Sequence, residues 1–370
     1  MRVRVLVLED FRGYERARFE FAPGATAFVG PNGAGKTNLL EAIHLVARGD
    51  SSRAGDDAEM IRWGAPLGRV AVEVNAGGED RRLEVTLFAP STEARRRPRR
   101  YTADGAPRRG DEVVGSFTVV AFFPQDTDLL VSAPSARRRY LDAMIAQADR
   151  DHRRDARAYA RVLEQRNALL RAGRDEEEPV PESELAFWDS ELVRLAAAVS
   201  FRRENAVRDL RPAFRAAAAA MRADPVPDIA YVGQVRGATA DERADAYWRV
   251  LAEKRDRERW QGTTLVGPHR DDLAVAAAER PLPAFASRGE QRSAVLALKL
   301  AEAEWLRSRS AELPIFLLDD VLSELDASRR SALAGAVPDG AQALITAAVR
   351  DSIPAALRER AAIVELVRSA

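Results

Sequence analysis

The sequence predicts an α/β fold in which a head assembled from both chain ends carries an inserted, mostly helical lobe. At 370 residues the chain is long enough for two domains with sizeable cores. Residues 1–90 alternate apolar and polar positions as strands do, and apolar strand-like runs return after residue 314. From about Ser135 the apolar spacing becomes helical. It sustains no heptads, so no long coiled coil is expected.

The first part of the chain alternates strands with one helix and one loop. Strands are predicted at residues 4–8, 26–29, 69–74, 83–87 and 117–123. A helix follows the second strand, because Leu39, Leu40 and Ile43 share one helical face. Arginines, prolines and glycines interrupt the alternation at residues 95–109, which predicts a basic loop there.

The remaining elements define the domain boundaries. After several amphipathic helices come a helix at 241–260, a strand at 263–266, a long helix from Glu290, and strands at 315–318, 343–346 and 363–367. The helical stretch lies between the two strand-rich parts of the chain. We therefore place the head at residues 1–123 and 285–370 and the helical lobe at residues 124–284.

Composition excludes several classes of protein. Lys+Arg and Asp+Glu are both 57, and zero net charge neither requires nor excludes a polyanionic partner. The chain has no cysteine and three histidines, which rules out disulfides and gives no pattern for a zinc site. Glu9 and Asp10 end the first apolar run too early for a signal peptide, and no apolar stretch reaches membrane-spanning length. We expect a cytoplasmic protein with no membrane partner.

A glycine-rich loop between the second strand and the helix fits the phosphate-binding pattern Gly-x-x-x-x-Gly-Lys-Ser/Thr. Its residues are Gly30, Pro31, Asn32, Gly33, Ala34, Gly35, Lys36 and Thr37. Glycines let backbone N–H groups close around phosphate oxygens, and the helix N-terminus adds partial positive charge. Lys36 is expected to neutralise the β- and γ-phosphates of ATP, while the Thr37 hydroxyl binds Mg²⁺. The alternative is a chance glycine turn. Such a turn would not be expected to lie between a buried strand and an amphipathic helix, as this loop does.

The apolar strand at 315–318 ends in two carboxylates, Asp319 and Asp320. At the carboxyl edge of a parallel sheet, beside a phosphate loop, these groups would meet Mg²⁺ and the hydrolytic water. We assign Asp319 to magnesium, and Asp320 to orienting or deprotonating the attacking water. By itself the pair would be better explained as an exposed acidic turn. The phosphate loop favours the catalytic interpretation.

Two further segments resemble parts of ABC-type ATPases. The first, Ser287, Arg288, Gly289, Glu290 and Gln291, resembles the signature loop, and residues 323–326, Ser-Glu-Leu-Asp, resemble the D-loop with Asp326. The strand ending in Asp319 resembles the Walker B strand between them. The resemblance implies a dimer in which the signature of one subunit contacts ATP held by the other. Taken alone, the first segment would be an ordinary helix cap.

Several segments together resemble the RecF family, from Met1 to about Thr346. They are residues 11–14 (Phe-Arg-Gly-Tyr), 38–43, 123–126, 134–142 and 264–273, of which the last contains Gly-Pro-His-Arg-Asp-Asp. The resemblance makes Gln125 the Q-loop residue, which contacts the γ-phosphate and magnesium and couples them to the lobe. Ala347 stands where transporter ATPases carry a switch histidine, so no histidine sensor is predicted. For His269 we favour a structural role in a tight turn.

Arginine-rich segments are the candidate DNA contacts. Seven arginines lie between Ser91 and Gly110, at positions 95, 96, 97, 99, 100, 108 and 109. The candidates are Arg95, Arg96, Arg97, Arg99 and Arg100, together with Arg137, Arg138 and Arg139. They could lie on phosphates without reading sequence. Charge alone favours solvated side chains, because the chain is rich in arginine throughout. The RecF resemblance favours DNA, because that family binds duplex DNA and gap junctions.

The resemblance implies an ATP-dependent homodimer that hydrolyses ATP slowly and closes on DNA. It also implies the partners RecO and RecR, and delivery of RecA to gapped DNA during repair and replication restart. One alternative is the ATPase subunit of a transporter, against which the large insert and the missing switch histidine argue. A second is a small-molecule kinase, which would have no use for a signature loop or a D-loop.

Overall fold

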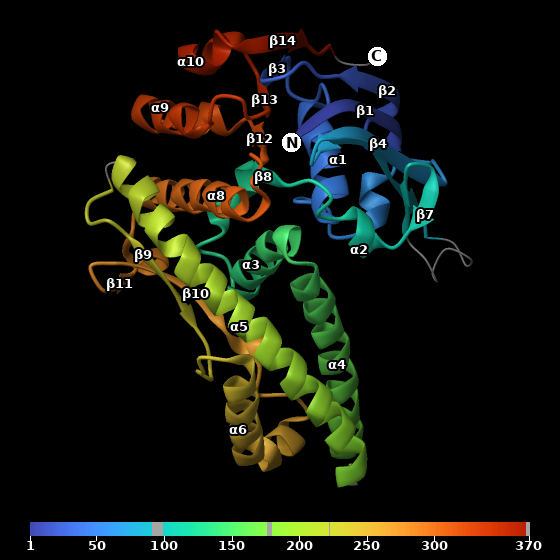
Figure 1. Ribbon diagram of the computed structural model, residues 1–370, viewed down its shortest axis with the longest axis vertical. Coiled ribbons are helices and arrows are strands. Elements are labelled where there is room, and N and C mark those ends of the chain that lie inside the picture. The colour runs from blue at the N-terminus through green and yellow to red at the C-terminus, as the bar shows by residue number, and fades with distance from the viewer. Residues whose placement is uncertain (91–98, 176–179, 222, 368–370) are drawn as a thin grey trace. The chain divides into compact units, whose positions relative to one another are not determined.

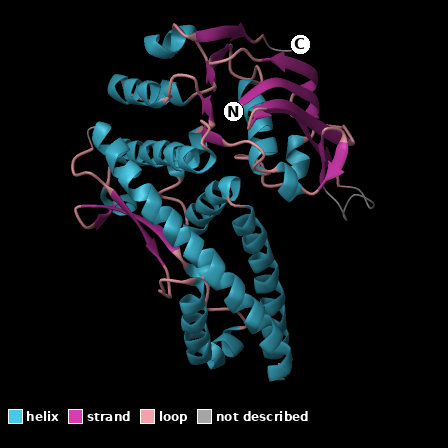
Figure 2. Ribbon diagram, viewed as in Figure 1, coloured by secondary structure: helices cyan, strands magenta, loops and turns pink. Residues whose placement is uncertain are grey.

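The computed structural model describes residues 1–90, 99–175, 180–221 and 223–367, and the chain forms two compact units (Figures 1 and 2). Unit 1 contains Met1–Leu129, Ala213–Val226 and Ala286–Ala370, and unit 2 contains Leu130–Pro212 and Pro227–Phe285. Unit 1 holds both sheets of the predicted head, and unit 2 is mainly helical (Figure 2). The predicted α/β head with a helical insertion is confirmed.

A five-stranded parallel sheet forms the centre of unit 1. Its order is β14 (Ala361–Glu365), β3 (Ala25–Val29), β13 (Ala343–Ala347), β12 (Ile315–Asp319) and β8 (Val119–Phe122). All neighbouring strands run parallel, so their carboxyl ends meet at one edge. Every residue of β12 and β13 is buried, as expected for near-continuous apolar strands covered on both faces. Strands from both chain ends pair here, which is why neither end could form the sheet alone.

A six-stranded antiparallel sheet forms the second layer of unit 1. Its order is β2 (Tyr14–Glu20), β1 (Arg2–Phe11), β4 (Leu67–Ala76), β5 (Glu79–Phe88), β6 (Arg99–Ala103) and β7 (Ala106–Arg108). Helix α1 (Lys36–Arg48) contacts strands of both sheets. Its apolar side chains, among them Leu39, Leu40 and Ile43, join one core with Leu6, Val72 and Leu317. That core fixes the helix that begins in the phosphate loop.

Further helices and 3₁₀ turns complete unit 1. They are η1 (Asp57–Met60), α2 (Gly110–Val113), η3 (Pro124–Asp128), α8 (Arg288–Ser310), η5 (Val321–Glu324), α9 (Ala327–Ala336), η6 (Arg350–Ser352) and α10 (Ala355–Arg358). Helix α8 contacts both β8 and η3. The predicted long helix near Glu290 is therefore confirmed, and it packs beside the carboxyl end of β8.

Unit 2 surrounds its own core. Its elements are α3 (Pro134–Ala148), α4 (Arg150–Asp175), α5 (Glu182–Ala220, up to Pro212), β9 (Asp228–Val232), α6 (Ala240–Gln261), η4 (Pro268–Arg270), β10 (Asp272–Ala277), β11 (Arg280–Pro281) and α7 (Leu282–Phe285). Tyr159, Leu195 and Tyr247, from three different helices, join this core. Among the helices in the described part of the chain, none combines the length and hydropathy that a membrane span requires.

Two predicted elements differ from the structure. Residues 99–108 form the hairpin β6–β7 within the predicted basic loop, because Asp104 and Gly105 both adopt positive φ in a tight turn. Residues 263–266 form no strand. Instead, the backbone N–H groups of Thr264 and Leu265 donate to the side chains of Asn167 and Glu258. Side-chain acceptors thus take the place of a neighbouring strand.

The boundaries of the units also differ from the predicted residues 124–284. Residues 124–129 belong to unit 1, since η3 packs against α8. Residues 213–226, which include the end of α5, also belong to unit 1. There Ala217, Ala220 and Met221 line an apolar cavity together with residues of α8 and α9. A single helix therefore contributes to both units, which helical periodicity alone could not reveal.

Candidate nucleotide-binding site

The phosphate loop joins β3 to α1 at the carboxyl edge of the parallel sheet. Gly33 and Gly35 have φ of 85° and 88°, a conformation that favours glycine. A Cβ on Gly30 would lie 2.2 Å from the carbonyl oxygen of Leu366. A Cβ on Gly35 would lie 2.7 Å from the Tyr14 hydroxyl, which donates to the Gly35 carbonyl. Gly30 and Gly35 are therefore required by the close approach of the backbone to its neighbours, and Gly33 is favoured by its positive φ.

Lys36 lies folded over this loop. Its Nζ donates to the carbonyl oxygens of Gly30 at 2.7 Å and Pro31 at 3.0 Å, and the side chain is buried. The ammonium group is thus held at the mouth of the loop, where the N–H groups of the first helical turn have no partner within the helix. A phosphate bound there would meet both a positive charge and free backbone donors.

Thr37 and Asp319 lie together although 282 positions separate them in sequence. The Thr37 hydroxyl donates to Asp319 Oδ1 at 2.8 Å, and the Thr346 hydroxyl donates to the same oxygen at 2.8 Å. The register of β12 and β13 pairs Asp319 with Thr346. Burial raises the pKa of the Asp319 carboxyl above its ordinary value of 3.8, while the two hydroxyl donors act in the opposite direction.

The oxygen atoms of Thr37 and Asp319 are suitable ligands for a magnesium ion. Hydroxyl and carboxylate oxygens are the hard ligands that Mg²⁺ prefers. A cation would also relieve the cost of burying the Asp319 charge. Among the described residues no group of three or more His, Asp or Glu side chains could hold a metal without help. This agrees with the usual coordination of Mg²⁺, which binds one or two protein ligands and completes its coordination shell with phosphates and water.

Asp320 begins the turn that follows β12. It has a φ of 47°, and its N–H donates to the Thr346 hydroxyl at 2.9 Å. Thr346 therefore holds two consecutive residues of the turn, through the Asp319 carboxylate and the Asp320 backbone. The partly exposed Asp320 carboxylate follows directly after the buried one. Position and exposure suit a group that handles a water molecule near a phosphate.

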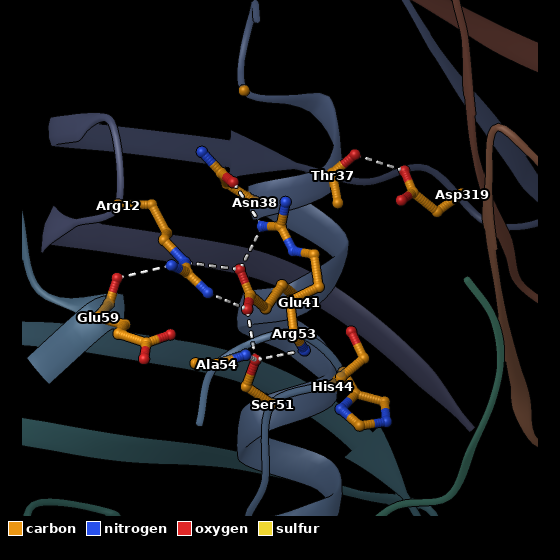
Figure 3. A network of polar contacts seen from close by, with 12 residues as sticks. Arg12, Thr37, Asn38, Glu41, His44, Ser51, Arg53, Ala54, Glu59 and Asp319 are labelled. Carbon is orange, nitrogen blue, oxygen red and sulfur yellow. Dashed lines mark hydrogen bonds and ion pairs between the residues drawn. The ribbon is translucent and has the colours of Figure 1, made fainter. Parts of the chain in front are cut away.

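A network around Glu41 braces the helix that starts in the phosphate loop (Figure 3). The Glu41 carboxylate is completely buried and accepts two hydrogen bonds from Arg12, at 2.6 and 2.9 Å. It also accepts from Ser51 and Arg53. Arg53 donates in addition to Asn38 Oδ1 at 2.8 Å. Burial by itself would raise the pKa of Glu41, but hydrogen bonds from these three donors hold that pKa below its ordinary 4.5.

Gln125 lies in η3, directly after β8. Its side-chain nitrogen donates to the carbonyl oxygen of Ser52 at 3.1 Å. Ser52 belongs to the loop that follows α1, next to Arg53 and the Glu41 network. The predicted Q-loop residue thus lies at the same sheet edge as the phosphate loop, in contact with the segment after its helix.

The predicted signature residues open helix α8. The Ser287 hydroxyl accepts from Glu290 N–H at 3.3 Å, and Glu290 accepts in return from Ser287 N–H at 2.7 Å. This is a capping box. Ser287, Arg288 and Glu290 are exposed, while Gly289 is partly covered by Arg329. The Gln291 side chain donates to the Ala286 carbonyl.

The predicted D-loop residue is tied to the same helix. Asp326 caps α9 by accepting from Arg329 N–H at 2.9 Å and also pairs with the Arg329 guanidinium at 2.6 Å. Arg329 Nε donates to the Ser293 hydroxyl of α8 at 2.6 Å. The predicted D-loop residue and the start of α8 are therefore connected by hydrogen bonds and an ion pair within one chain.

The structure removes some candidate DNA contacts. Arg137 is buried and makes a two-pronged ion pair with Asp272, so it cannot lie on phosphates. Arg99 pairs with Asp57 of η1. Among the other candidates, Arg138 donates to the Asp271 carbonyl, Arg100 lies exposed over the Phe88 ring and Arg139 is exposed. Arg95, Arg96 and Arg97 lie outside the described residues.

His269 is held inside unit 2. Its Nε2 donates to the Thr264 carbonyl at 3.1 Å, and its Nδ1 accepts from the Tyr159 hydroxyl at 2.6 Å. Burial lowers the pKa of His269 to about 4, so the ring is neutral at pH 7 and uses both nitrogens. Gly267 has a φ of 134°, and a Cβ there would meet the Tyr159 hydroxyl at 2.2 Å. These contacts agree with the structural role favoured for His269.

Sequence reasoning missed the residues that support this site. Thr346 ends an apolar strand and gives no signal of its own, because its role follows from the register with β12. Glu41 lies among apolar residues of α1, and a fully buried acid there could have been suspected. Its partners Arg12 and Arg53 lie 29 and 12 positions away. Residues 11–14 and 38–43 both carry the RecF resemblance, but nothing in the sequence indicates that Arg12 and Glu41 pair.

A phosphate loop at the edge of a parallel sheet, a strand ending in Asp319 beside it and a helix whose exposed start carries the predicted signature residues are the features of an ABC-type ATPase head. The family described as the RecF/RecN/SMC N terminal domain matches residues 2–366. The DNA replication and repair protein RecF of Roseiflexus castenholzii is 41% identical over 350 residues, covering 90% of this chain and 89% of that protein.

Two solved structures of the recombination mediator protein RecF of the RecFOR pathway are similar as well. Its RecF-ATPrS form has a TM-score of 0.84 at 26% identity, covering 95% of this chain and 94% of the other. Its RecF-ATP form has a TM-score of 0.83 at 27% identity, covering 94% and 92%. The chain belongs to the RecF family of DNA replication and repair proteins.

Proposed function

We propose that this chain is an ATP-driven recombination mediator, acting in the cytoplasm, in which ATP binding closes a homodimer on DNA and slow hydrolysis reopens it. The observation that carries the proposal is the contact of Thr37 with Asp319. It unites the phosphate loop with the Walker B strand at the carboxyl edge of one sheet. Relatives solved as RecF-ATP and RecF-ATPrS support ATP as the nucleotide.

Each residue of the site has a role in this proposal. Residues 30–37 surround the phosphates, with Lys36 as the counter-charge and Gln125 as the contact to the γ-phosphate. Thr37 and Asp319, with Gln125, would hold Mg²⁺, which supplies positive charge against the β- and γ-phosphates. Asp320 orients or deprotonates the attacking water. Preorganised charges of this kind stabilise the transition state without reorganising when the phosphoryl bond breaks.

The dimer follows from the exposed end of α8. Ser287 and Gly289 lie at a helix N-terminus, whose backbone donors suit an anion. In the proposal that anion is the γ-phosphate held by a second copy, so the two symmetric interfaces each enclose one ATP. ATP binding and dimerisation must then strengthen each other by the same factor.

DNA is the proposed polymer partner, bound through its phosphates as duplex or gapped DNA without sequence reading. The exposed Arg100 and Arg139 are the described candidates that remain available for such contacts. RecO and RecR are the proposed protein partners, and RecA is the protein delivered to gapped DNA. The membership in a family of DNA replication and repair proteins supports this part of the proposal.

Sedimentation with and without Mg-ATP tests the proposal. The Asp320→Asn chain should bind ATP and accumulate as a dimer, because closure occurs but hydrolysis does not. Lys36→Ala should stay monomeric, since the phosphate counter-charge is removed. Ser287→Arg should bind ATP as a monomer yet fail to dimerise, because a bulky cation fills the space meant for the partner's phosphate. A Ser287→Arg chain that dimerises and hydrolyses ATP normally refutes the composite site.

A further inference from the structure

Helix α8 carries the proposed signature loop at its start and a buried lysine further along. Lys299 is one of three lysines in a chain of 370 residues. Its side chain is 4% exposed, and Nζ lies 3.3 Å from Asp126 Oδ2. Asp126 belongs to η3, directly after Gln125, and the same Oδ2 accepts from Phe123 N–H at 2.8 Å. The lysine thus joins the signature helix to the turn that carries the proposed γ-phosphate contact.

A second buried ion pair lies one helical turn further along α8. Glu302 is completely buried and pairs with Arg48 at 3.0 Å. Arg48 is the last residue of α1, the helix that begins in the phosphate loop. Because Lys299 and Glu302 are three positions apart, they face the same side of α8. One side of α8 is therefore bound to η3, which carries Gln125, and to the C-terminal end of α1, the helix that begins in the phosphate loop.

The packing between these ion pairs and the signature loop is tight. Val295 and Leu296 of α8 face Phe122 and Phe123, at the end of β8. The partly open hollow beside them, which Asp126, Thr127 and Arg292 also line, has a volume of about 20 Å³, room for about one water molecule. A displacement of η3 relative to α8 would have to separate the buried Lys299 ammonium from the partly exposed Asp126 carboxylate or compress this apolar contact. Both are costly, so the two elements should move together.

We propose that Lys299 and Arg48 are positioning residues through which the nucleotide site of one chain sets the position of the signature loop that this chain offers to its partner. From Lys299 to Ser287 is twelve residues, about 18 Å along a helix that moves as one body. The inference rests on the proposed function, in which Gln125 contacts the γ-phosphate and Ser287 acts on the partner's ATP. It adds that the two composite sites communicate through α8 rather than act independently.

A mixed dimer with one working site tests the direction of this coupling. One chain carries Ser287→Arg, so it supplies a phosphate loop but no signature. The other carries Asp320→Asn, so it binds ATP without hydrolysing it and supplies the signature. Different affinity tags isolate the mixed dimer, and all hydrolysis then comes from one composite site. Lys299→Met is introduced first into one chain and then into the other. This separates its effect on the signature loop from its effect on the phosphate loop of the same chain.

We expect Lys299→Met to lower hydrolysis about 2- to 30-fold when it lies in the Asp320→Asn chain, the range seen for residues that carry coupling between sites. The same change in the Ser287→Arg chain should cost less, and ATP affinity of the isolated chains should stay unchanged. Lys299→Arg should restore activity because it keeps the charge. Arg307→Met is the matched control, since Arg307 pairs with Glu304 on the exposed side of the same helix.

Asp126→Asn provides a second test if Lys299→Met does not fold, because the amide oxygen can still accept from Phe123 N–H while the charge is removed. It should show the same asymmetry between the two chains. Equal losses in both positions would mean that Lys299 serves only the fold, and no loss would mean that α8 is placed by other contacts. Either result overturns the inference. A mixed dimer that is inactive before Lys299 is changed overturns the proposed function, and the inference falls with it.

Discussion

Replacing Glu41 with glutamine should destabilise unit 1 strongly, although the two side chains have nearly the same shape. The Glu41 carboxylate is completely buried and is shared by two guanidinium groups and one hydroxyl. Glu41→Gln leaves the positive charges of Arg12 and Arg53 without their buried counter-charge. Removing one partner of a buried ion pair typically costs about 3–5 kcal/mol, because the remaining charge is uncompensated.

The expected loss is large enough to measure by thermal unfolding. Each kcal/mol lowers Tm by roughly 2–4 °C in domains of 150–250 residues, so Glu41→Gln should lower Tm by about 6–20 °C. Glu304→Gln is the matched control, because Glu304 makes an ion pair that is half exposed on both sides. Such a pair contributes about 0–1 kcal/mol. Equal Tm values for the two variants would show that the Glu41 network contributes no more than a surface pair.

The pH dependence gives an independent check on the same residue. The folded pKa of Glu41 lies below its ordinary value of 4.5. A lowered carboxyl pKa means that the stabilisation is fully present above the unfolded value and is lost as the pH falls through the folded value. The difference in Tm between wild type and Glu41→Gln should therefore be constant near pH 7 and shrink below about pH 4.5. A difference that stays constant down to pH 3 would contradict a role for the ionised carboxylate.

Three further predictions concern the arginines and the proposed dimer. Alanine at the exposed Arg100 and Arg139 should flatten the salt dependence of DNA binding, by about 0.9 log unit for each duplex phosphate that the protein no longer neutralises. Arg137→Ala should instead lower the stability of unit 2, because it leaves Asp272 without its partner, and the salt slope should not change. The opposite pattern would place the DNA-binding arginine at position 137. Ser287→Asp should keep the unfolding temperature, since aspartate is a good N-cap, but should abolish ATP-induced dimers in sedimentation because two negative charges would meet.

The sequence predicted the parts of the site that lie in continuous motifs. The phosphate loop needs glycines at fixed positions between a strand and a helix, so residues 30–37 can be recognised from the sequence alone. The carboxylates at 319 and 320 follow an apolar strand, and the strand order then brings Asp319 to Thr37. Local patterns were sufficient here because the parallel sheet aligns the carboxyl ends of its strands.

Other features could not be predicted because they depend on pairing between distant segments. Thr346 reaches Asp319 only through the register of β12 and β13. Arg137 stood in a run of three arginines that suggested an exposed basic surface. The helix directs Arg137 inward, where it pairs with Asp272, a residue 135 positions away in the sequence. A run of charged residues shows only the composition of that segment, whereas the partner of each charge is decided by the tertiary fold.

The proposed phosphate contact of Ser287 is compatible with the role of this residue as a helix cap. A serine hydroxyl has one hydrogen to donate and two lone pairs that accept. In the capping box the Ser287 oxygen accepts from Glu290 N–H, and a hydrogen bond from the Ser287 hydroxyl to the Glu290 carboxylate lowers the pKa of that carboxyl. In the proposed dimer, a phosphate held by the second copy would take the place of the Glu290 carboxylate as the acceptor of this hydroxyl. The cap holds the Ser287 side chain at the exposed helix start, so finding it does not argue against the proposed composite site.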